Sequence, residues 1–185
     1  NPARSILDHS MDLDTYKQLL LHNYRAYWQI ETELEAFLPF LKLDKAFRLE
    51  KDLEALGVAP DKGTAKLQID SLPEAFGAAY VMEGSALGGL VITKHLTRCQ
   101  KLKPLEPQHF FSGDKTSLSS WKRFKEELMQ QVFTEHEMTK LLAKAKETFM
   151  FFEEVYQQDQ EQPLSENSPA RLPAEFFNKG NQRAQ

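Results

Sequence analysis

The chain has 185 residues, of which 41% are hydrophobic, and it carries a formal net charge of −4. This length and composition predict one compact domain with a sizeable core, and the acidic balance argues against a general nucleic-acid binder. The only cysteine, Cys99, excludes an internal disulfide and a cysteine-rich metal site. We see neither an apolar run long enough to span a membrane nor a secretory leader, so we expect a cytoplasmic protein.

The first third of the chain predicts two helices. Asp12 or Asp14 can cap the first one, because a carboxylate there accepts amide protons of the opening turn. Apolar residues then recur at three- and four-residue steps as far as Phe37, and we expect Pro39 to end the helix. A shorter amphipathic helix is predicted over residues 45–56, followed by a loop.

The segment 73–96 is the most informative part of the sequence. It reads as one helix, with Ser71 as its cap and Glu74 at the capping-box position. It holds four glycines, three of them within six residues, although each interior glycine costs a helix about 1 kcal/mol relative to alanine. Either another backbone packs closely there, or a ligand lies against the bare helix, or the helix bends. Taken alone, the spacing of Gly84 and Gly88 is equally typical of close packing between helices.

The rest of the chain also lacks strands. Residues 101–117 contain two prolines and a glycine and predict a loop, whereas 118–133 and 135–157 predict two further helices. No alternation of period two is long enough for a sheet. We therefore expect an all-α fold with a helical domain over residues 1–157 and a polar, mobile tail over 158–185.

At GSALGG, residues 84–89, the sequence resembles the distal-helix signature of bacterial, biliverdin-producing heme oxygenases, and YVME at 80–83 extends the likeness. Shorter segments fall in the family order: DLDTY at 12–16, WKRF at 121–124 and AKETF at 145–149. The glycine motif is fairly specific, and the other segments are informative only by their order. The resemblance covers roughly residues 6–156 and implies a single-domain, multi-helical bundle with a kinked, glycine-rich distal helix.

The resemblance also implies a heme site on this helix. Heme is a flat apolar disc with two carboxylates on one edge, and residues without a side chain let a helix backbone approach it closely. By this likeness Gly84 and Gly88 lie over the heme, and Gly89 permits the bend. Ser85 holds part of a water network that delivers protons to the reacting oxygen. Gly84, Ser85 and Gly88 are thus the expected catalytic residues, and with Gly89 they are expected to bind heme.

Two further heme contacts are expected from the resemblance. Lys125 stands where the family carries a basic residue at the heme edge, and it would neutralise a carboxylate there. Phe149 begins an aromatic stripe on the last helix and would contact the heme. Both have plainer readings, a solvated helix face for Lys125 and ordinary core for the stripe. Tyr80 and Glu83, one turn before the glycine motif, are open between heme contact and core.

The resemblance implies a histidine iron ligand on a helix shortly before the segment that corresponds to residues 1–7. None of the histidines in the sequence matches it; they are His9, His22, His95, His109 and His136. We expect His9 and His22 to be solvated or rim residues, so no metal ligand is assigned. The opening Asn-Pro, without a start methionine, favours a chain that lacks this first, proximal helix and leaves residues 5–7 poorly held. The alternative is a protein that lost the ligand and kept the fold.

The function implied by the resemblance is oxidative opening of heme to biliverdin, with release of iron and carbon monoxide. Heme is then both substrate and cofactor, oxygen is consumed, and electrons come from a ferredoxin or a reductase. A biliverdin-accepting protein is a further expected partner, whereas nucleic acid and membrane are not. The alternative is a non-catalytic, heme-oxygenase-like module that binds a tetrapyrrole or another protein. A third reading is a helical bundle whose glycines only pack tightly.

Overall fold

The computed structural model describes residues 2–103, 105, 108–111 and 116–158. These residues form helices and no strands, which confirms the all-α prediction, and none of their helices is long and apolar enough to cross a membrane. The elements are α1 (Pro2–Leu7), α2 (Leu13–Leu34), α3 (Lys45–Ala55), α4 (Leu72–Leu96), the 3-10 helix η1 (Gln100–Leu102), α5 (Thr116–Gln130) and α6 (Glu135–Gln157). The tail predicted over 158–185 lies, from residue 159 on, outside the described residues.

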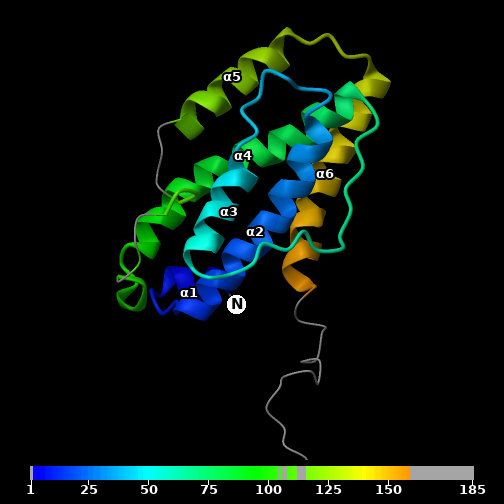
Figure 1. Cartoon of the computed structure of the whole chain (residues 1–185). Helices are drawn as coiled ribbons and strands as arrows, with labels where there is room; N and C mark the ends of the chain where they lie inside the picture. The colour runs from blue at the N-terminus through cyan, green and yellow to red at the C-terminus, as the bar shows by residue number, and fades with distance from the viewer. Residues whose placement is uncertain (1, 104, 106–107, 112–115, 159–185) are drawn as a thin grey trace, which may run out of the picture.

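Helix α4 is the central element of the fold. It packs most extensively against α6 and also contacts α5, α2 and α1, while α3 packs against α2 (Figure 1). The core between these helices is apolar and includes fully buried aromatic side chains from three of them, namely Tyr16, Phe76 and Phe124. The glycine-rich helix is therefore positioned by neighbours on several sides, and its exposed side is set by what those neighbours leave uncovered.

The boundaries of the first helices follow local signals in part. Asp12 caps α2 as predicted, because its Oδ1 accepts a hydrogen bond from the Thr15 amide at 2.9 Å. The prediction that Pro39 ends α2 is wrong. The helix ends at Leu34, because the chain leaves it in hydrogen-bonded turns back to the Leu34 carbonyl. Helix α3 stops as predicted before Gly57, whose φ of +70° suits a residue without a side chain.

The start of α4 differs from the prediction. Ser71 holds the N-cap position, but its side chain makes no capping hydrogen bond. The carboxylate of Glu74 accepts instead from the amide of Asp70, at 2.7 Å, so the predicted capping box is not formed. A complete capping box occurs at α6, where the side chains of Thr134 and Glu137 bond to each other's backbone amides. This box accounts for the break between α5 and α6.

Two expectations near the N-terminus and on α2 are also wrong. The first residues are held by the fold: Ile6 is buried, and the carbonyl of Ser5 accepts the backbone amides that follow α1. His22 is buried rather than at a rim, and its ring meets the edge of Tyr156 with the ring centres 5.2 Å apart. Burial of His22 depends on α6, which lies far away in the sequence.

Candidate functional site

One side of α4 carries three glycines whose surroundings differ. Gly77, Gly84 and Gly88 share a side because steps of seven and eleven residues at about 100° each nearly complete whole turns. At Gly77 an added Cβ would overlap the Leu141 carbonyl oxygen of α6 and come within 3.0 Å of the Ala145 amide nitrogen. This part of the side is closed, and Gly77 is required by backbone packing between α4 and α6.

The same side of α4 is open further along. At Gly84 the nearest atoms to an added Cβ belong to the Trp121 ring, at 3.8 Å, which is ordinary contact distance. At Gly88 and Gly89 an added Cβ would meet no heavy atom of the described residues within 4 Å. These three glycines, Gly84, Gly88 and Gly89, are called here the open face, because the described part of the chain leaves their backbone uncovered. Whether the helix bends there, as the sequence predicts, stays a prediction.

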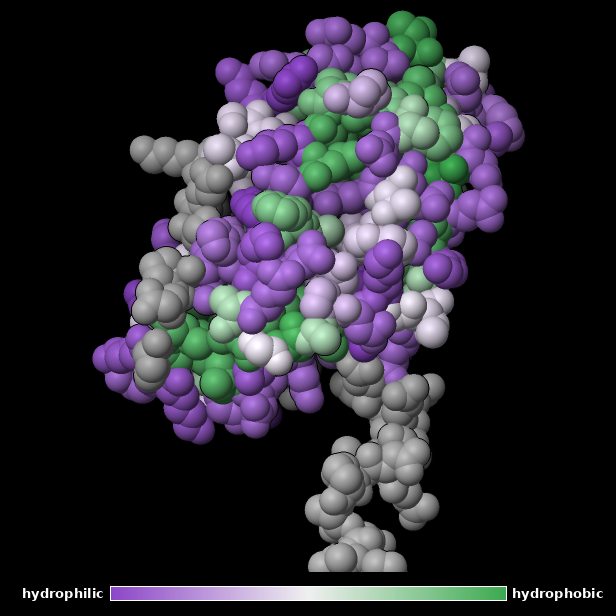
Figure 2. Space-filling view, in the orientation of Figure 1, coloured by the Kyte–Doolittle hydropathy of each residue, from purple (hydrophilic) through white to green (hydrophobic). Residues whose placement is uncertain are grey.

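An exposed apolar side chain follows the open face on the same helix. Figure 2 also shows apolar surface at the lower left of the view, where Figure 1 places α1. Val91 on α4 is 56% exposed and Leu7 on α1 is 64% exposed. Val91 comes three positions after Gly88, about one turn further along α4, and an exposed apolar side chain there is typical of a surface that takes a ligand or partner. Uncovered backbone followed by an apolar side chain suits one face of a flat apolar disc.

Ser85 lies at the edge of this face with a fixed hydroxyl. Its Oγ donates to the Met82 carbonyl at 2.7 Å, so the hydroxyl of Tyr27, at 2.6 Å, donates to Ser85 Oγ. The Tyr27 ring is held between Phe110 and Phe152, with ring centres 5.3 and 5.4 Å away. Burial raises the pKa of Tyr27 to about 12, so this hydroxyl stays protonated and keeps donating.

A buried carboxylate on α3 supports this arrangement from the other side. Asp52 accepts hydrogen bonds from the backbone amides of His109 and Phe110, at 2.7 and 2.8 Å. These two bonds hold the short described segment 108–111 against the helices. They thereby fix Phe110 against Tyr27, and indirectly the hydroxyl that orients Ser85.

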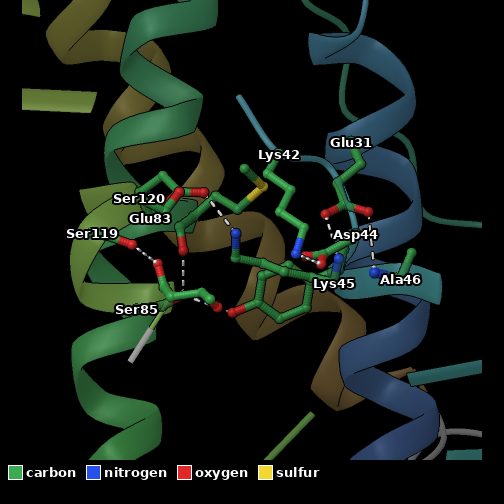
Figure 3. Close-up of polar contacts among 12 residues, drawn as sticks. Glu31, Lys42, Asp44, Lys45, Ala46, Glu83, Ser85, Ser119 and Ser120 are labelled. Carbon is green, nitrogen blue, oxygen red and sulfur yellow. Dashed lines mark hydrogen bonds and ion pairs between the residues drawn. The ribbon is translucent and has the colours of Figure 1, made fainter. Parts of the chain in front are cut away.

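A buried ion pair lies immediately before the open face (Figure 3). Glu83 is fully buried; its Oε1 lies 2.6 Å from Lys45 Nζ, and its Oε2 accepts from Ser120 Oγ at 2.6 Å. Lys45 is itself held, because Glu31 accepts from the amides of Lys45 and Ala46 at 2.8 and 3.0 Å. Burial raises the pKa of Glu31 despite these bonds.

Sequence reasoning left Glu83 undecided and missed Lys45. A signal for the first was present, since Glu83 is an acidic residue in the middle of an otherwise apolar helix, where a buried charge needs a partner. The partner could not be identified, because Lys45 lies 38 positions earlier on another helix.

The two other predicted heme contacts are placed differently. Lys125 lies with its Nζ 5.4 Å from the centre of the Trp121 ring, so α5 brings it toward the edge of the open face near Gly84. Phe149 is 63% exposed on α6, which excludes the core reading for this ring. The other stripe residues, Phe152 and Tyr156, instead face α2. Heme contact by Lys125 and Phe149 stays a prediction.

The histidines have different surroundings. His9 Nε2 and His95 Nδ1 lie 3.0 Å apart with stacked rings, which joins the turn between α1 and α2 to the end of α4. His136 is exposed in the first turn of α6. Within the described residues no group of three or more histidine, cysteine or acidic side chains could hold a metal ion. This does not test the iron ligand, because one histidine is enough to hold a heme iron, and the absence of an assigned ligand stays a prediction.

Comparisons with known proteins agree with this picture. The family model for heme oxygenase matches residues 1–158. The chain is 29% identical over 150 residues to a heme oxygenase of Xanthomonas campestris pv. campestris, an alignment that covers 77% of this chain and 88% of that protein. The fold is similar to the NO- and CO-bound heme oxygenase of Neisseria meningitidis, with a TM-score of 0.67, 22% identity, and coverage of 92% and 88% of the two chains.

The family match extends across all the described helices. Heme oxygenases bind heme both as substrate and as prosthetic group and degrade it. The all-α architecture and the glycine helix that the sequence predicted agree with this assignment. This chain belongs to the heme oxygenase family and is an enzyme of heme degradation.

Proposed function

We propose that heme binds against the open face of α4 and is opened there to biliverdin, with release of iron and carbon monoxide. The observation that carries this proposal is the room at Gly88 and Gly89 beside the oriented hydroxyl of Ser85. A substrate disc stacked there would meet backbone, so a diatomic molecule can fit between the disc and the helix. Gly84 borders the same space under the Trp121 ring.

In this proposal heme supplies the redox chemistry. The chain orients the heme and positions the water that delivers protons. Ser85 Oγ donates to Met82 and accepts from Tyr27, which leaves one lone pair free to accept from a water molecule on the open face. Tyr27, with its pKa of about 12, orients Ser85 and does not itself release a proton near neutral pH. Protons therefore arrive through water that Ser85 positions.

Two further side chains are proposed to contact the heme. Lys125 carries a positive charge near the Trp121 ring, where it would pair with a heme carboxylate. Phe149 offers an exposed aromatic ring that a bound heme would cover. Burial of such a ring against a flat apolar ligand contributes favourably to binding in proportion to the apolar area removed from water.

The proposal includes partners outside this chain. Oxidative opening consumes oxygen and reducing equivalents, so an electron donor such as a ferredoxin or a reductase is required. The product biliverdin then passes to an accepting protein or is released. We propose that the protein acts in the cytoplasm.

The test is a hemin titration followed by reduction. Hemin absorbance should change in a saturable way, and addition of ascorbate or a reductase in air should produce a biliverdin band. Ser85→Ala should keep hemin binding and slow biliverdin formation, whereas Ser119→Ala, an exposed serine on α5, should change neither. Saturable binding without biliverdin would indicate a binding module, and no saturable binding would contradict the proposed site.

A further inference from the structure

The ion pair between Lys45 and Glu83 is difficult to explain by stability alone. Both side chains are buried, and removing two charges from water costs about as much as their attraction returns. Apolar residues of similar size are often as stable in such places. The pair is better explained by the geometry it imposes, because a buried charge tolerates few positions of its partners.

The contacts of Glu83 reach the open face through α5. Its Oε2 accepts from Ser120 Oγ at 2.6 Å, and the next residue of α5 is Trp121. The Trp121 ring lies 3.8 Å from the position of a Cβ at Gly84 and 5.5 Å from the ring of Tyr80. A shift of Ser120 along α4 would therefore move this ring over the open face or away from it.

The other end of the network is fixed as well. Lys45 is the first residue of α3, and the Glu31 carboxylate of α2 accepts from its amide at 2.8 Å. Its ammonium group lies 2.6 Å from Glu83 Oε1 (Figure 3). The chain of polar contacts thus runs from α2 through α3 and α4 to α5, and it crosses α4 one residue before Gly84.

We propose that Glu83 is a positioning residue: with Lys45 and Ser120 it fixes α5 so that Trp121 covers α4 at Gly84 and leaves it open at Gly88. Trp121 then marks the inner edge of the heme position and determines how far heme can slide along α4. This inference rests on the proposed heme face, but the placement of Trp121 can be measured without heme.

The test reads the fluorescence of Trp121 in the full chain carrying Trp28→Phe, so that one tryptophan remains. Phenylalanine keeps an aromatic ring beneath Lys62, which lies 4.2 Å from the centre of the Trp28 ring. Ser120→Ala and Glu83→Gln are introduced into this parent. Ser119→Ala is the matched control, because its hydroxyl bonds only within α5, to the Thr116 carbonyl. Circular dichroism accompanies each variant, and Ser120→Ala decides the matter if Glu83→Gln does not fold.

We expect Ser120→Ala and Glu83→Gln to shift the Trp121 emission and to increase its quenching by acrylamide, whereas Ser119→Ala behaves as the parent. The hemin dissociation constant should rise up to about tenfold in the same two variants, as expected for loss of a hydrogen bond to a charged group. Quenching of Trp121 by bound hemin should weaken in parallel.

Unchanged emission and acrylamide quenching in Ser120→Ala would overturn the inference. Altered emission with an unchanged hemin dissociation constant would also overturn it, while leaving the open face as the heme site. If the parent itself binds no hemin, the proposed function fails, and the acrylamide measurement still decides whether the network positions Trp121.

Discussion

Gly77 and Gly88 lie eleven positions apart on the same side of α4, and their surroundings are opposite. At Gly77 the backbone of α6 occupies the place of a side chain, whereas at Gly88 no heavy atom of the described chain lies within 4 Å of an added Cβ. Both are interior helix glycines and both lower helix propensity by a similar amount. The cost is offset by helix packing at Gly77, and no contact within the described residues offsets it at Gly88.

This difference indicates two functions for one glycine pattern. The closed half of α4 holds the helix against α6 and sets its distance from the core. The open half leaves backbone uncovered, which is the arrangement that the proposed heme site requires. A glycine that packs should be intolerant of any side chain for reasons of stability, whereas a glycine that faces a ligand should tolerate a side chain in the fold and reject it in binding.

The largest effect is expected at the closed half. Gly77→Ala places a methyl group on the Leu141 carbonyl oxygen, so α4 and α6 must separate. We expect the free energy of unfolding to fall by about 3 kcal/mol, because overpacking outweighs the gain in helix propensity. Urea denaturation followed by circular dichroism measures this. The same substitution at Gly88 is the matched control, and equal behaviour of the two variants would remove the distinction between the halves.

The pH dependence of stability tests how far the open half of α4 extends toward Tyr27. Tyr27 has a folded pKa of about 12, raised by burial from an ordinary value of 10.0. The unfolded chain therefore releases this proton first as pH rises, and the stabilisation present below pH 10 is lost between pH 10 and 12. At a pH of about 11.5 the loss should be about 2 kcal/mol relative to pH 9.

The measurement compares urea denaturation of the wild-type chain and Tyr27→Phe at these two pH values. Tyr16 and Tyr156 also have pKa values raised by burial and remain in the variant. Tyr16 cancels in the comparison, whereas the loss of the Tyr27 charge also removes a smaller contribution to the raised pKa of Tyr156, in the same direction. The variant should lose less stability than the wild type on going to high pH. Equal losses of stability in the two chains would mean that Tyr27 is hydrated in the folded protein. The open half of α4 would then extend to Tyr27.

A bulky residue in the open half should affect binding rather than folding. Gly88→Leu has room on the helix surface, so circular dichroism and the unfolding midpoint should stay near those of the wild type. Its side chain would occupy the space proposed for heme and oxygen, and the hemin dissociation constant should rise about tenfold or more. A variant that keeps hemin affinity and biliverdin formation would show that this face is not the heme site.

The parts of the fold that the sequence predicted well have strong local signals. Asp12 caps α2 and Gly57 follows α3, and both signals act within a few residues. The early end of α2 follows from turns back to the Leu34 carbonyl that the apolar pattern did not indicate, and the burial of His22 depends on α6, which local patterns do not describe. The missing side-chain cap at Ser71 was also not predicted, since Glu74 accepts from the Asp70 amide instead of completing a capping box with Ser71.

At the candidate site, too, local signals could be predicted from the sequence and long-range contacts could not. The motif at residues 84–89 predicted where a ligand would lie, but the pattern alone could not separate packing from binding, because that depends on where α6 and α5 lie. Ser85 was expected to hold water, yet its partner Tyr27 is 58 positions away in the sequence. The sequence likewise could not identify Lys45 as the partner of Glu83, because the two residues are 38 positions apart. Long-range pairing, rather than helix propensity, is what the structure adds to the site.

The smallest expected effect is the most direct test of the open half. Gly88→Ala adds one methyl group to a helix interior where the described residues place no other heavy atom within 4 Å, so no strain from them opposes the gain in helix propensity. We expect the free energy of unfolding to increase by about 0.5–1 kcal/mol, in contrast to the decrease at Gly77. Thermal and urea denaturation can resolve this change. Hemin affinity should fall less than in Gly88→Leu, since a methyl group occupies only part of the space above the helix. A less stable Gly88→Ala would mean that Gly88 is packed as Gly77 is, and the glycine would then need no ligand to explain it.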